Sequence, residues 1–556
     1  MEFWAYPYLI GYLAILLFWM LGSHKQILFW LYLWQLKEYH WGRFFAHFET
    51  AKGKSLFFNW LFIAKILILV AGIFYFVYLK KILLPLSAIT ILFFLQGARS
   101  LWGILRLNLL HPELTKKSRM LILASHIVIF GSGFVVFNSF LGEMVLFDIF
   151  QAAILLLILD ILLPAMVGLT VLILQPLTIR GKNMILDKAR DIIGNRPDLT
   201  TIGITGSYGK SVTKELLAHI LSKRFSVLKT KKNQNTEIGI AQTIIGKLNA
   251  GHRFFVCEIG AVHKGRIKQV SEIVKPKIAI LTGINQQHLG VFGSQQSIID
   301  GKFEIMETVP EFGTAIINYA SRLLRENFES QKQKIKAKNI ILVGKDIWAS
   351  DIKISVTRLL LSVNYKDKKI ILNTNARGKF MVEPILLAAA VALAAGMELA
   401  EIAEILNRTD FEEFNIKFAS IEAKTQPGVK MNILDSTYSS NPDGVMAHLD
   451  YLNLFGGKKA VILPCLIELG KNSKDIHYQI GQKIGQTCDL AVITTKDRFR
   501  EIKKGALAVG MEADNIFYAE KPARIKELFK KQMPTGTTIL LEGRIAQSIT
   551  DVFSNN

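Results

Sequence analysis

Hydrophobic positions follow two different patterns along this chain. Up to about residue 178 they form unbroken runs of bilayer-spanning length, and beyond it they form short runs between amphipathic stretches. About 20 apolar residues cross the hydrocarbon core, so the long runs predict an α-helical membrane domain of about five helices. The predicted spans are Phe3–Leu21, Phe57–Leu79, Ile82–Trp102, Met120–Leu141 and Ile149–Leu174.

A shorter apolar stretch, Ile27–Leu36, follows the first predicted span. It is too short to cross the membrane, and basic and aromatic residues such as Lys37, Trp41 and Arg43 follow it. This pattern favours a helix that lies in the interface. An additional or re-entrant helix is the alternative. The first span lacks a basic leading segment and a small-residue cleavage site, which predicts a retained segment.

Charged residues between the spans predict the orientation. Basic residues gather before the second and fourth spans, whereas the stretch 142–148 carries only acidic charges. The positive-inside bias therefore predicts a multi-pass protein of the cytoplasmic membrane, with the N-terminus outside and everything after Leu174 in the cytoplasm. Lys80 and Lys81 conflict with this scheme, because they would lie outside. The basic residues are Lys37, Arg43, Lys52, Lys54, Arg99, Arg106, Lys116, Lys117 and Arg119.

Three polar residues fall inside the predicted spans, namely Lys65, His126 and Asp160. Charges within a membrane are candidates for function. The structural alternative, which we favour, is that Lys65 extends towards the interface while Asp160 pairs with a neighbouring helix. Pro164 follows Asp160 by one turn and would loosen the helix there.

From Thr201 onward, β-rich runs alternate with helical patterns, which predicts βαβ units in mostly parallel sheets. Two sets of strands are separated by the alanine-rich helix Met381–Gly396. The chain therefore divides into a membrane domain 1–178 and two α/β domains, 179–412 and 413–556. The predicted strands are Thr201–Thr205, Phe254–Ile259, Ile278–Leu281, Ala315–Ile317 and Ile340–Val343, then Met431–Leu434, Ala460–Pro464, Leu490–Thr494 and Thr538–Leu541.

Composition adds two constraints. The 556 residues carry a formal net charge of +22, which in a membrane protein indicates contact with anionic lipid. Because no basic stripe is interleaved with aromatic residues, we expect no nucleic-acid partner. The cysteines, Cys257, Cys465 and Cys488, are scattered and form no CxxC pair. They therefore predict neither a zinc site nor a disulfide framework.

The stretch TIGITGSYGKS, Thr201–Ser211, carries the first sign of chemistry. A short β-branched strand leads into a glycine turn, and Lys210 and Ser211 open a helix. Backbone N–H groups, the helix N-terminus and the lysine would hold a phosphate, and the Ser211 hydroxyl would face Mg²⁺. Ile204 stands where the strict P-loop has its first glycine, so the loop is a variant. Its predicted nucleotide contacts are Thr205, Gly206, Ser207, Tyr208, Gly209, Lys210 and Ser211.

Four further residues lie where a ligand would meet the sheet. Glu258 ends a buried strand and Asp435 ends another, and ligands of open parallel sheets lie at strand carboxyl ends. His288 stands in GINQQHLGVFGS and Lys302 in DGKFEI. A carboxylate in this position suits Mg²⁺. Each residue alone is weak evidence, since a single histidine is usually structural and a single lysine is usually solvated.

Together these segments resemble the Mur ligase family, and within it most closely the ligases that add D-alanyl-D-alanine to a UDP-muramoyl tripeptide. The resemblance covers about residues 200–548. Its segments are TGSYGKS, NQNTEIGIA with Asn233, Asn235 and Glu237, EIGA at Glu258–Ala261, HLGVFGS at His288–Ser294, Lys302 with Glu304, DSTYSSNP, Glu468–His477, and EGR at Glu542–Arg544. It implies a P-loop-type central ATPase domain and a Rossmann-like C-terminal domain.

The resemblance also implies roles. ATP would phosphorylate a carboxylate, and an amine would attack the acyl phosphate. Lys210, His288, Lys302 and Asp435 would be catalytic, and Lys417 and Asp435 would also contact the nucleotide. Ser211 and Glu258 would bind one Mg²⁺, while His288 and a carbamylated Lys302 would serve a second. Asn235, Glu237, Tyr438, Asn441 and Pro442 would contact substrate.

Three departures from the family pattern are visible. Glu383 stands where the family helix that grips adenine has asparagine, and Lys417 replaces an arginine, which alone could bind phosphate in a bidentate way. Membrane helices replace the domain that binds the UDP-sugar. This last departure predicts a membrane-linked acceptor, a lipid-carried cell-wall precursor that receives an amino acid or dipeptide, or else helices that dock a membrane enzyme. A UDP-linked acceptor stays open as the alternative. A membrane-anchored, non-catalytic nucleotide-binding protein is the main alternative, and a transporter gated by an ATPase is a weaker one.

Overall fold

The computed structural model describes most of the chain, in two compact units, Met1–Lys182 and Asn183–Asn556. We call them the helical unit and the α/β unit and describe each by itself. The described residues are 6–37, 39–48, 51–57, 59–140, 146–231, 234–260, 264–286, 289–414, 416–422, 430–437, 440–532 and 534–553.

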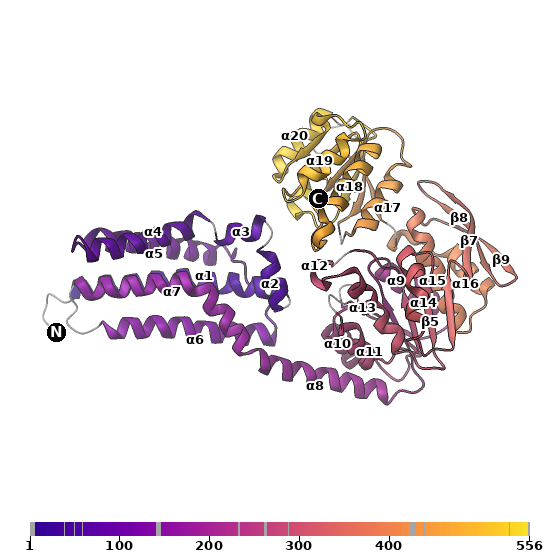
Figure 1. Ribbon diagram of the computed structural model, residues 1–556, viewed down its shortest axis with the longest axis horizontal. Helices are drawn as coiled ribbons and strands as arrows, with labels where there is room; N and C mark the ends of the chain where they lie inside the picture. The colour runs from indigo at the N-terminus through magenta and orange to yellow at the C-terminus, as the bar shows by residue number, and fades with distance from the viewer. Residues whose placement is uncertain are drawn as a thin grey trace. The chain divides into compact units, whose positions relative to one another are not determined.

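The helical unit is a bundle of long apolar helices (Figure 1). Among the described residues, five helices are long and apolar enough to cross a membrane. The predicted first span is wrong in its extent, because Ile27–Leu36 continues the same helix and is neither an interfacial nor a separate helix. The long helices are α1 (Tyr6–Leu36), α4 (Trp60–Val77), α5 (Leu83–Leu105), α6 (Lys116–Ser139) and α7 (Leu146–Ile173), with short α2 (Trp41–His47) and α3 (Ala51–Phe57) between.

Polar contacts explain why α1 stays helical through the polar residues of the stretch 22–26. His24 Nδ1 lies 2.9 Å from His126 Nε2, and Gln26 donates to Asp160 Oδ1 at 2.6 Å. The Lys65 ammonium lies 2.7 Å from Asp160 Oδ2. Each group thereby meets a partner on another helix, so the backbone stays helical. Asp160 pairs with a neighbouring helix as predicted, but Lys65 is its partner and does not extend to the interface.

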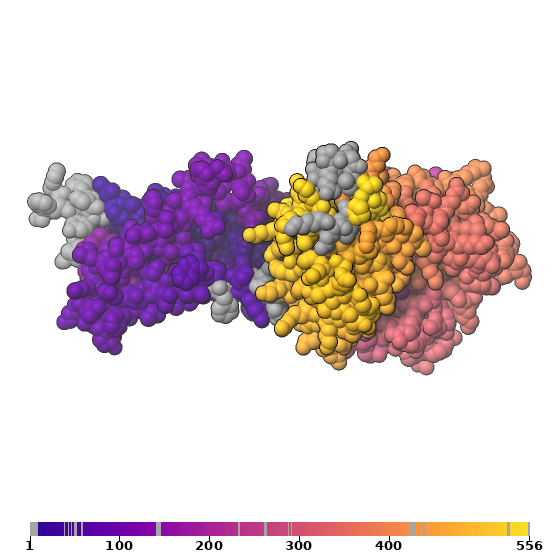
Figure 2. Space-filling view, turned by 90° about the horizontal axis from the view of Figure 1, so that it is seen from above, coloured from indigo at the N-terminus to yellow at the C-terminus, as the bar shows by residue number. Residues whose placement is uncertain are grey.

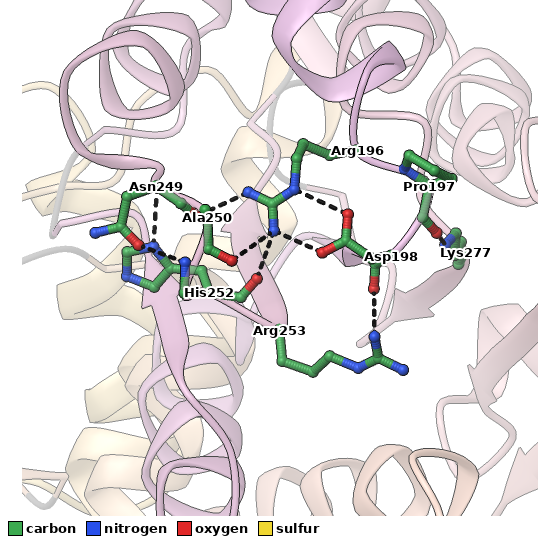
Figure 3. A network of polar contacts seen from close by, with 9 residues as sticks. Arg196, Pro197, Asp198, Asn249, Ala250, His252, Arg253 and Lys277 are labelled. Atoms are coloured by element: carbon green, nitrogen blue, oxygen red, sulfur yellow. Dashed lines mark hydrogen bonds and ion pairs between the residues drawn. The ribbon is translucent and has the colours of Figure 1, made fainter.

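Helix α8 (Gln175–Gly194) leads to the first strand, and a polar network fixes the entry to that strand (Figure 3). The Arg196 guanidinium binds Asp198 at 2.8 and 2.9 Å and donates to the backbone carbonyls of Asn249, at 2.7 Å, and His252, at 2.9 Å. Arg253 donates to the Asp198 carbonyl at 3.0 Å. These contacts join the segment before the strand to the loop before its parallel neighbour, so they set where both strands begin.

The central sheet has nine strands in the order β2-β3-β1-β4-β5-β6-β7-β8-β9. Strands β1, β3, β4, β5 and β6 are parallel to their neighbours among β1 to β6, as predicted, whereas the parallel strand β2 and the antiparallel hairpins β7–β8–β9 were not predicted. Their bounds are β1 (Thr200–Thr205), β2 (Val227–Lys229), β3 (Phe254–Glu258), β4 (Ile278–Leu281), β5 (Thr314–Asn318), β6 (Asn339–Val343), β7 (Ile347–Ile354), β8 (Leu359–Tyr365) and β9 (Lys368–Thr374).

Apolar side chains cover both faces of the central sheet, which is why strands such as β3 and β4 are buried at every position. One core includes Leu216, Leu217 and Ile385 from the helices over one face. The other includes Ala189, Ile267 and Phe303 from helices over the opposite face. The helices are α9 (Lys210–Ser222), α15 (Val382–Ala394) and α16 (Leu399–Arg408) for the first core, and α8, α10 (Glu237–Lys247), α11 (Arg266–Val274), α13 (Gln295–Glu307) and α14 (Arg322–Lys332) for the second.

The C-terminal sheet has six strands in the order β10-β11-β15-β12-β13-β14. Among the strands that the structure describes in this sheet, only β10 is antiparallel to its neighbour. We call the part of the α/β unit that contains this sheet the C-terminal lobe and the part that contains the central sheet the central lobe. The C-terminal lobe (yellow) lies beside the central lobe in Figures 1 and 2. The elements are β10 (Lys417–Glu422), β11 (Lys430–Ser436), α17 (Pro442–Leu452), β12 (Lys459–Leu463), α18 (Ser473–Thr487), β13 (Leu490–Ile493), α19 (Phe499–Leu507), β14 (Ile516–Tyr518), α20 (Pro522–Gln532) and β15 (Thr538–Glu542).

Candidate functional site

The turn between β1 and α9 is shaped by two glycines with positive φ angles. Gly206 has φ +150°, and a Cβ on it would stand 2.1 Å from Thr282 Oγ1. Gly209 has φ +74° and precedes the first residue of α9. The Ser207 N–H donates to the Gly283 carbonyl at 2.7 Å, which ties the turn to the end of β4. The result is a tight loop that opens onto a helix N-terminus, a geometry that binds phosphate.

Lysines surround this loop. Lys210 Nζ folds back onto the Gly206 carbonyl at 2.8 Å. Lys214, one turn further along α9, is fully buried, and its Nζ lies 3.8 Å from Glu258 Oε2 and 3.2 Å from Glu215 Oε1. Lys302, on α13, is buried as well. Buried ammonium groups need anionic partners, so a gathering of lysines at this loop suits a ligand that carries negative charge.

Burial changes the protonation of two of these lysines. Burial, reinforced by the charge of Lys210, lowers the pKa of Lys302 to about 7, although Glu258 and Glu304 oppose the shift. Burial also lowers the pKa of Lys210, with Glu258 opposing. Near neutral pH a large fraction of Lys302 is therefore a neutral amine.

Glu258 is the carboxylate at the centre of the site. It ends β3 and is buried, and the Ser211 hydroxyl donates to its Oε2 at 2.7 Å. The Asn235 amide donates to its Oε1 at 3.0 Å. This oxygen-rich set is of the kind that Mg²⁺ prefers, with a nucleotide supplying further oxygens. The residues that the structure describes contain no group of three or more His, Cys, Asp or Glu side chains that could hold a metal alone.

A second set of polar groups lies on the β5 side of the loop. Asn318 ends β5, and its amide donates to Glu383 Oε2 at 2.6 Å and to the Thr282 carbonyl at 2.7 Å. Burial, with the charge of Asp443, raises the pKa of Glu383. The Tyr208 ring lies against Gly283, where a Cβ would stand 2.2 Å from the ring. Burial and the charges of Glu383 and Asp443 raise the Tyr208 pKa.

The C-terminal lobe contributes contacts through the start of α17. Asn441 caps this helix by accepting from the Gly444 N–H at 3.1 Å. The Asn285 amide, just after β4, donates to Asn441 Oδ1 at 3.1 Å and to Asp443 Oδ2 at 2.7 Å. Asn285 also holds the phosphate loop, because its N–H donates to Ser207 Oγ at 3.2 Å. Asn285 therefore joins the start of α17 to the phosphate loop.

The structure brings together most of the predicted residues that it describes. Thr205, whose hydroxyl donates to the Ile259 carbonyl at 2.9 Å, lies at the loop with Lys210, Ser211 and Glu258. Asn235 contacts Glu258, although we predicted a substrate contact. His288, Tyr438 and Asn233 lie outside the described residues.

Four other predicted residues have contacts or positions that do not involve the loop lysines. Glu237 forms an ion pair with Arg266 at 2.8 Å. Asp435 accepts from the Thr437 N–H at 2.9 Å and from its hydroxyl at 2.7 Å. Lys417 is the cross-strand neighbour of Asp435 and is exposed. Pro442 is the first residue of α17.

Sequence reasoning missed Lys214, Thr282, Asn285 and Asn318. Lys214 could have been found, because residues four apart lie on one helix face and Lys210 was already identified. Thr282, Asn285 and Asn318 lie at or after the ends of strands that had been predicted correctly. The rule that selected Glu258 at a strand end would have selected these residues too.

Comparisons with known proteins agree with this geometry. Residues 204–392 match the Mur ligase middle domain. The UDP-N-acetylmuramoyl-tripeptide–D-alanyl-D-alanine ligase of Synechocystis is 30% identical over 285 residues, which cover 51% of this chain and 59% of that protein. The ligase of the same name from Haemophilus influenzae is 30% identical over 290 residues, covering 51% and 61%. The chain thus spans about three fifths of the length of these curated relatives.

Solved structures show the same fold. MurF from Acinetobacter baumannii superposes with a TM-score of 0.59 at 24% identity, covering 67% of this chain and 80% of that one. MurF ligase from Thermotoga maritima, solved in complex with ADP, superposes with a TM-score of 0.55 at 23% identity, covering 67% and 83%. At these identities the likeness concerns the fold. It covers about two thirds of this chain.

Proposed function

Since this chain contains the Mur ligase middle domain, we propose that its α/β unit is an ATP-dependent ligase of cell-wall precursor synthesis. The substrates are a carboxylate on a precursor peptide and an amine of the D-alanyl-D-alanine type, which is the substrate in the printed names of the curated relatives. The observation that carries the proposal is the loop itself, where Lys210, Lys214 and Lys302 gather around the buried carboxylate Glu258.

The reaction has two balanced steps. A carboxylate oxygen of the acceptor attacks the γ-phosphorus of ATP, and the bond to the β-phosphate oxygen breaks, which yields an acyl phosphate and ADP. The amine nitrogen then attacks the acyl carbon, phosphate leaves and the nitrogen loses a proton. Charge on the transferring phosphoryl group must be stabilised throughout. Lys210 and the loop N–H groups would supply this stabilisation.

Residues present in the chain fit Mg²⁺. Ser211 and Glu258 would hold one ion, and Lys302, if carbamylated, would join His288 at a second. Bound Mg²⁺ would neutralise phosphate charge and polarise the phosphoryl oxygens. Carbamylation needs a neutral amine, and a Lys302 pKa of about 7 supports it, because the ammonium has then lost its proton near physiological pH. The new carbamate would also reverse the charge of a lysine that otherwise repels a cation.

The link between the lobes supports a closing step. Asn285 contacts both the phosphate loop and the start of α17, so a ligand at the loop and the position of the C-terminal lobe affect each other. Closure would exclude water, which protects an acyl phosphate from hydrolysis. Tyr208, Asn318 and Glu383 would line the nucleoside side of the site.

The helical unit supports a membrane location, because five of its described helices have spanning length and apolarity. The basic residues between the spans support a cytoplasmic α/β unit. We propose that the acceptor is also membrane-linked, with its peptide carried by a lipid. A soluble UDP-linked acceptor, as in the names of the relatives, is the outcome that would oppose this part of the proposal.

The test uses the full chain in detergent micelles. Amide formation and phosphate release are measured with ATP, D-alanyl-D-alanine and either a lipid-linked or a UDP-linked peptide acceptor. We expect faster turnover with the lipid-linked acceptor and loss of turnover in Lys302→Ala. Equal or faster use of the UDP-linked acceptor contradicts the lipid proposal. Nucleotide binding without phosphate release on either acceptor identifies a non-catalytic nucleotide-binding protein.

A further inference from the structure

Helices α1 and α5 of the helical unit meet along a seam of small residues. A Cβ on Gly97 would stand 2.8 Å from the Phe18 carbonyl oxygen, and a Cβ on Gly22 would stand 3.3 Å from Gln96 Cβ. Glycines of this kind let the helix backbones approach closely. The side chains beside the seam are therefore held in fixed positions relative to each other.

Two cations flank this seam. Lys25 on α1 is half-buried and follows Gly22 by three residues, and Arg99 on α5 is exposed and follows Gly97 by two, so each lies within one turn of a seam glycine. Neither has a hydrogen bond or ion pair to another described residue. Helices α1 and α5 contain no Asp or Glu. Asp160, which reaches α1 from α7, is already bound by Lys65 and Gln26.

Neutral donors stand beside the cations. Gln96, Arg99 and Ser100 are spaced i, i+3 and i+4, so they share one side of α5. Ser100 is 0% exposed, and its hydroxyl lacks a hydrogen-bond partner among the described residues, as does the buried Gln96 amide nitrogen. Unpaired buried polar groups are costly, so a ligand that accepts their hydrogens would relieve that cost. Two cations and two unpaired donors suit an anion with several oxygens.

The position of the seam indicates where such an anion comes from. Arg99 lies six residues before the end of α5, about 9 Å along the helix. Spans alternate in direction, so that end lies on the side where α7 leaves the membrane and continues to the α/β unit. Lysine and arginine in such positions extend towards lipid head groups. The exposed side of Arg99 faces out of the bundle, where a lipid can approach.

We propose that Lys25, Gln96, Arg99 and Ser100 form a binding site for the phosphate or diphosphate head group of a lipid in the cytoplasmic leaflet. The site rests on the proposed membrane location and, if the lipid is a diphosphate, it deepens the proposed function by holding the lipid-linked acceptor at the membrane surface. Arg99 and Lys25 supply the positive charge, and Gln96 and Ser100 position the phosphate oxygens by donating hydrogen bonds to them.

Binding is tested on the full chain by native mass spectrometry from detergent micelles, without nucleotide, so that failure of the ligase reaction does not affect the readout. The probes are phosphatidylglycerol, a polyprenyl diphosphate and diacylglycerol, which lacks phosphate. We expect one phosphate-bearing lipid per chain and no comparable binding of diacylglycerol. Tighter binding of the diphosphate identifies the lipid-linked precursor class, whereas equal binding identifies anionic phospholipid in general.

Variants locate the site. Lys25→Gln and Arg99→Gln should each weaken lipid binding about tenfold, because each removes a charge-assisted hydrogen bond. Ser100→Ala should weaken it about threefold and tests the site without changing charge. The matched control is Arg106→Gln, which removes a cation at the end of the same helix. The Arg106 guanidinium stacks on Trp102, 4.2 Å from the ring centroid. Wild-type binding in both charge variants, or equal losses in Arg106→Gln, would overturn the site.

Discussion

Buried charges are arranged differently in the two units. In the helical unit Lys65 and Asp160 are one cation and one anion, 2.7 Å apart, with side chains 5% and 1% exposed. Gln26 satisfies the remaining carboxylate oxygen. In the α/β unit the lysines Lys210, Lys214 and Lys302 gather around the phosphate loop with Glu258, which is buried. Glu215 and Glu304 lie beside this group, and the exposed Lys229 pairs with Glu215.

The carboxylates of the second cluster are also partly committed elsewhere. Glu304 accepts the Gly265 and Lys268 N–H groups at 2.5 and 3.0 Å, which caps α11. Glu215 pairs with Lys229 as well as Lys214. The loop N–H groups add further positive potential. A balanced buried pair can serve structure alone, whereas an unbalanced buried cluster needs an external anion, so the charge balance separates structural charges from functional ones.

The largest expected effect is at Lys210. Lys210→Met removes a cation at the transferring phosphates, and single cations of this kind contribute about 10³- to 10⁵-fold in phosphoryl transfer. We expect ATP-dependent phosphate release to fall by about that factor, or about 4–7 kcal/mol in activation free energy. The measurement is steady-state release with saturating acceptor and amine.

Lys223→Met is the matched control, because Lys223 is the exposed residue that ends the same helix. It should leave turnover within about twofold. If Lys210→Met retained more than a tenth of wild-type turnover, the positive charge at the loop would not serve phosphoryl transfer. The different charge arrangement of the two clusters would then have no functional consequence.

The second effect tests the balanced pair. Removing one partner of a buried ion pair leaves an uncompensated charge and costs about 3–5 kcal/mol, whereas replacing both partners with neutral groups is often nearly neutral. We therefore expect Lys65→Met and Asp160→Asn each to lower the thermal stability of the protein in detergent strongly. The double variant should recover most of the loss. Equal instability in all three variants would indicate that the hydrogen bond from Gln26 to Asp160 stabilises the protein independently of the balance of charge.

The sequence predicted much of this arrangement for identifiable reasons. Strand-end residues such as Glu258 could be predicted, because apolar runs mark parallel strands and ligands gather at their carboxyl ends. The continuity of α1 could not, since it depends on contacts of His24 and Gln26 with residues more than 100 positions away. The β7–β9 hairpins were missed because exposed edge strands have weak hydrophobic patterns.

The Lys65–Asp160 pair shows the same limit of prediction from sequence, here among the apolar helices of the helical unit. Both residues were visible in the sequence as charges within spans, but a list of positions does not say which charges meet. Likewise the link from Asn285 to α17 joins segments about 156 residues apart. Pairing across long separations is a property of the packed chain, and local patterns do not encode it.

The smallest effect concerns the pH dependence of stability. The Lys302 pKa is lowered from 10.5 to about 7 by burial and by Lys210. Between those values the unfolded chain holds a proton that the folded chain lacks, so the free energy of unfolding rises with pH, by up to about 1.4 kcal/mol per pH unit. Below pH 7 both states are protonated and this contribution to the slope vanishes.

Lys302→Met removes that proton difference. In CO₂-free buffer without nucleotide or Mg²⁺, denaturant unfolding of the α/β unit within the full chain should therefore depend less on pH between 7 and 9 in the variant than in wild type. The lowered pKa of Lys210 adds a slope to both proteins. Lys336→Met, at an exposed position, should keep the wild-type slope. Identical slopes in wild type and Lys302→Met would mean that Lys302 stays protonated in the folded chain over this pH range, and the loop cluster would then carry its full positive charge.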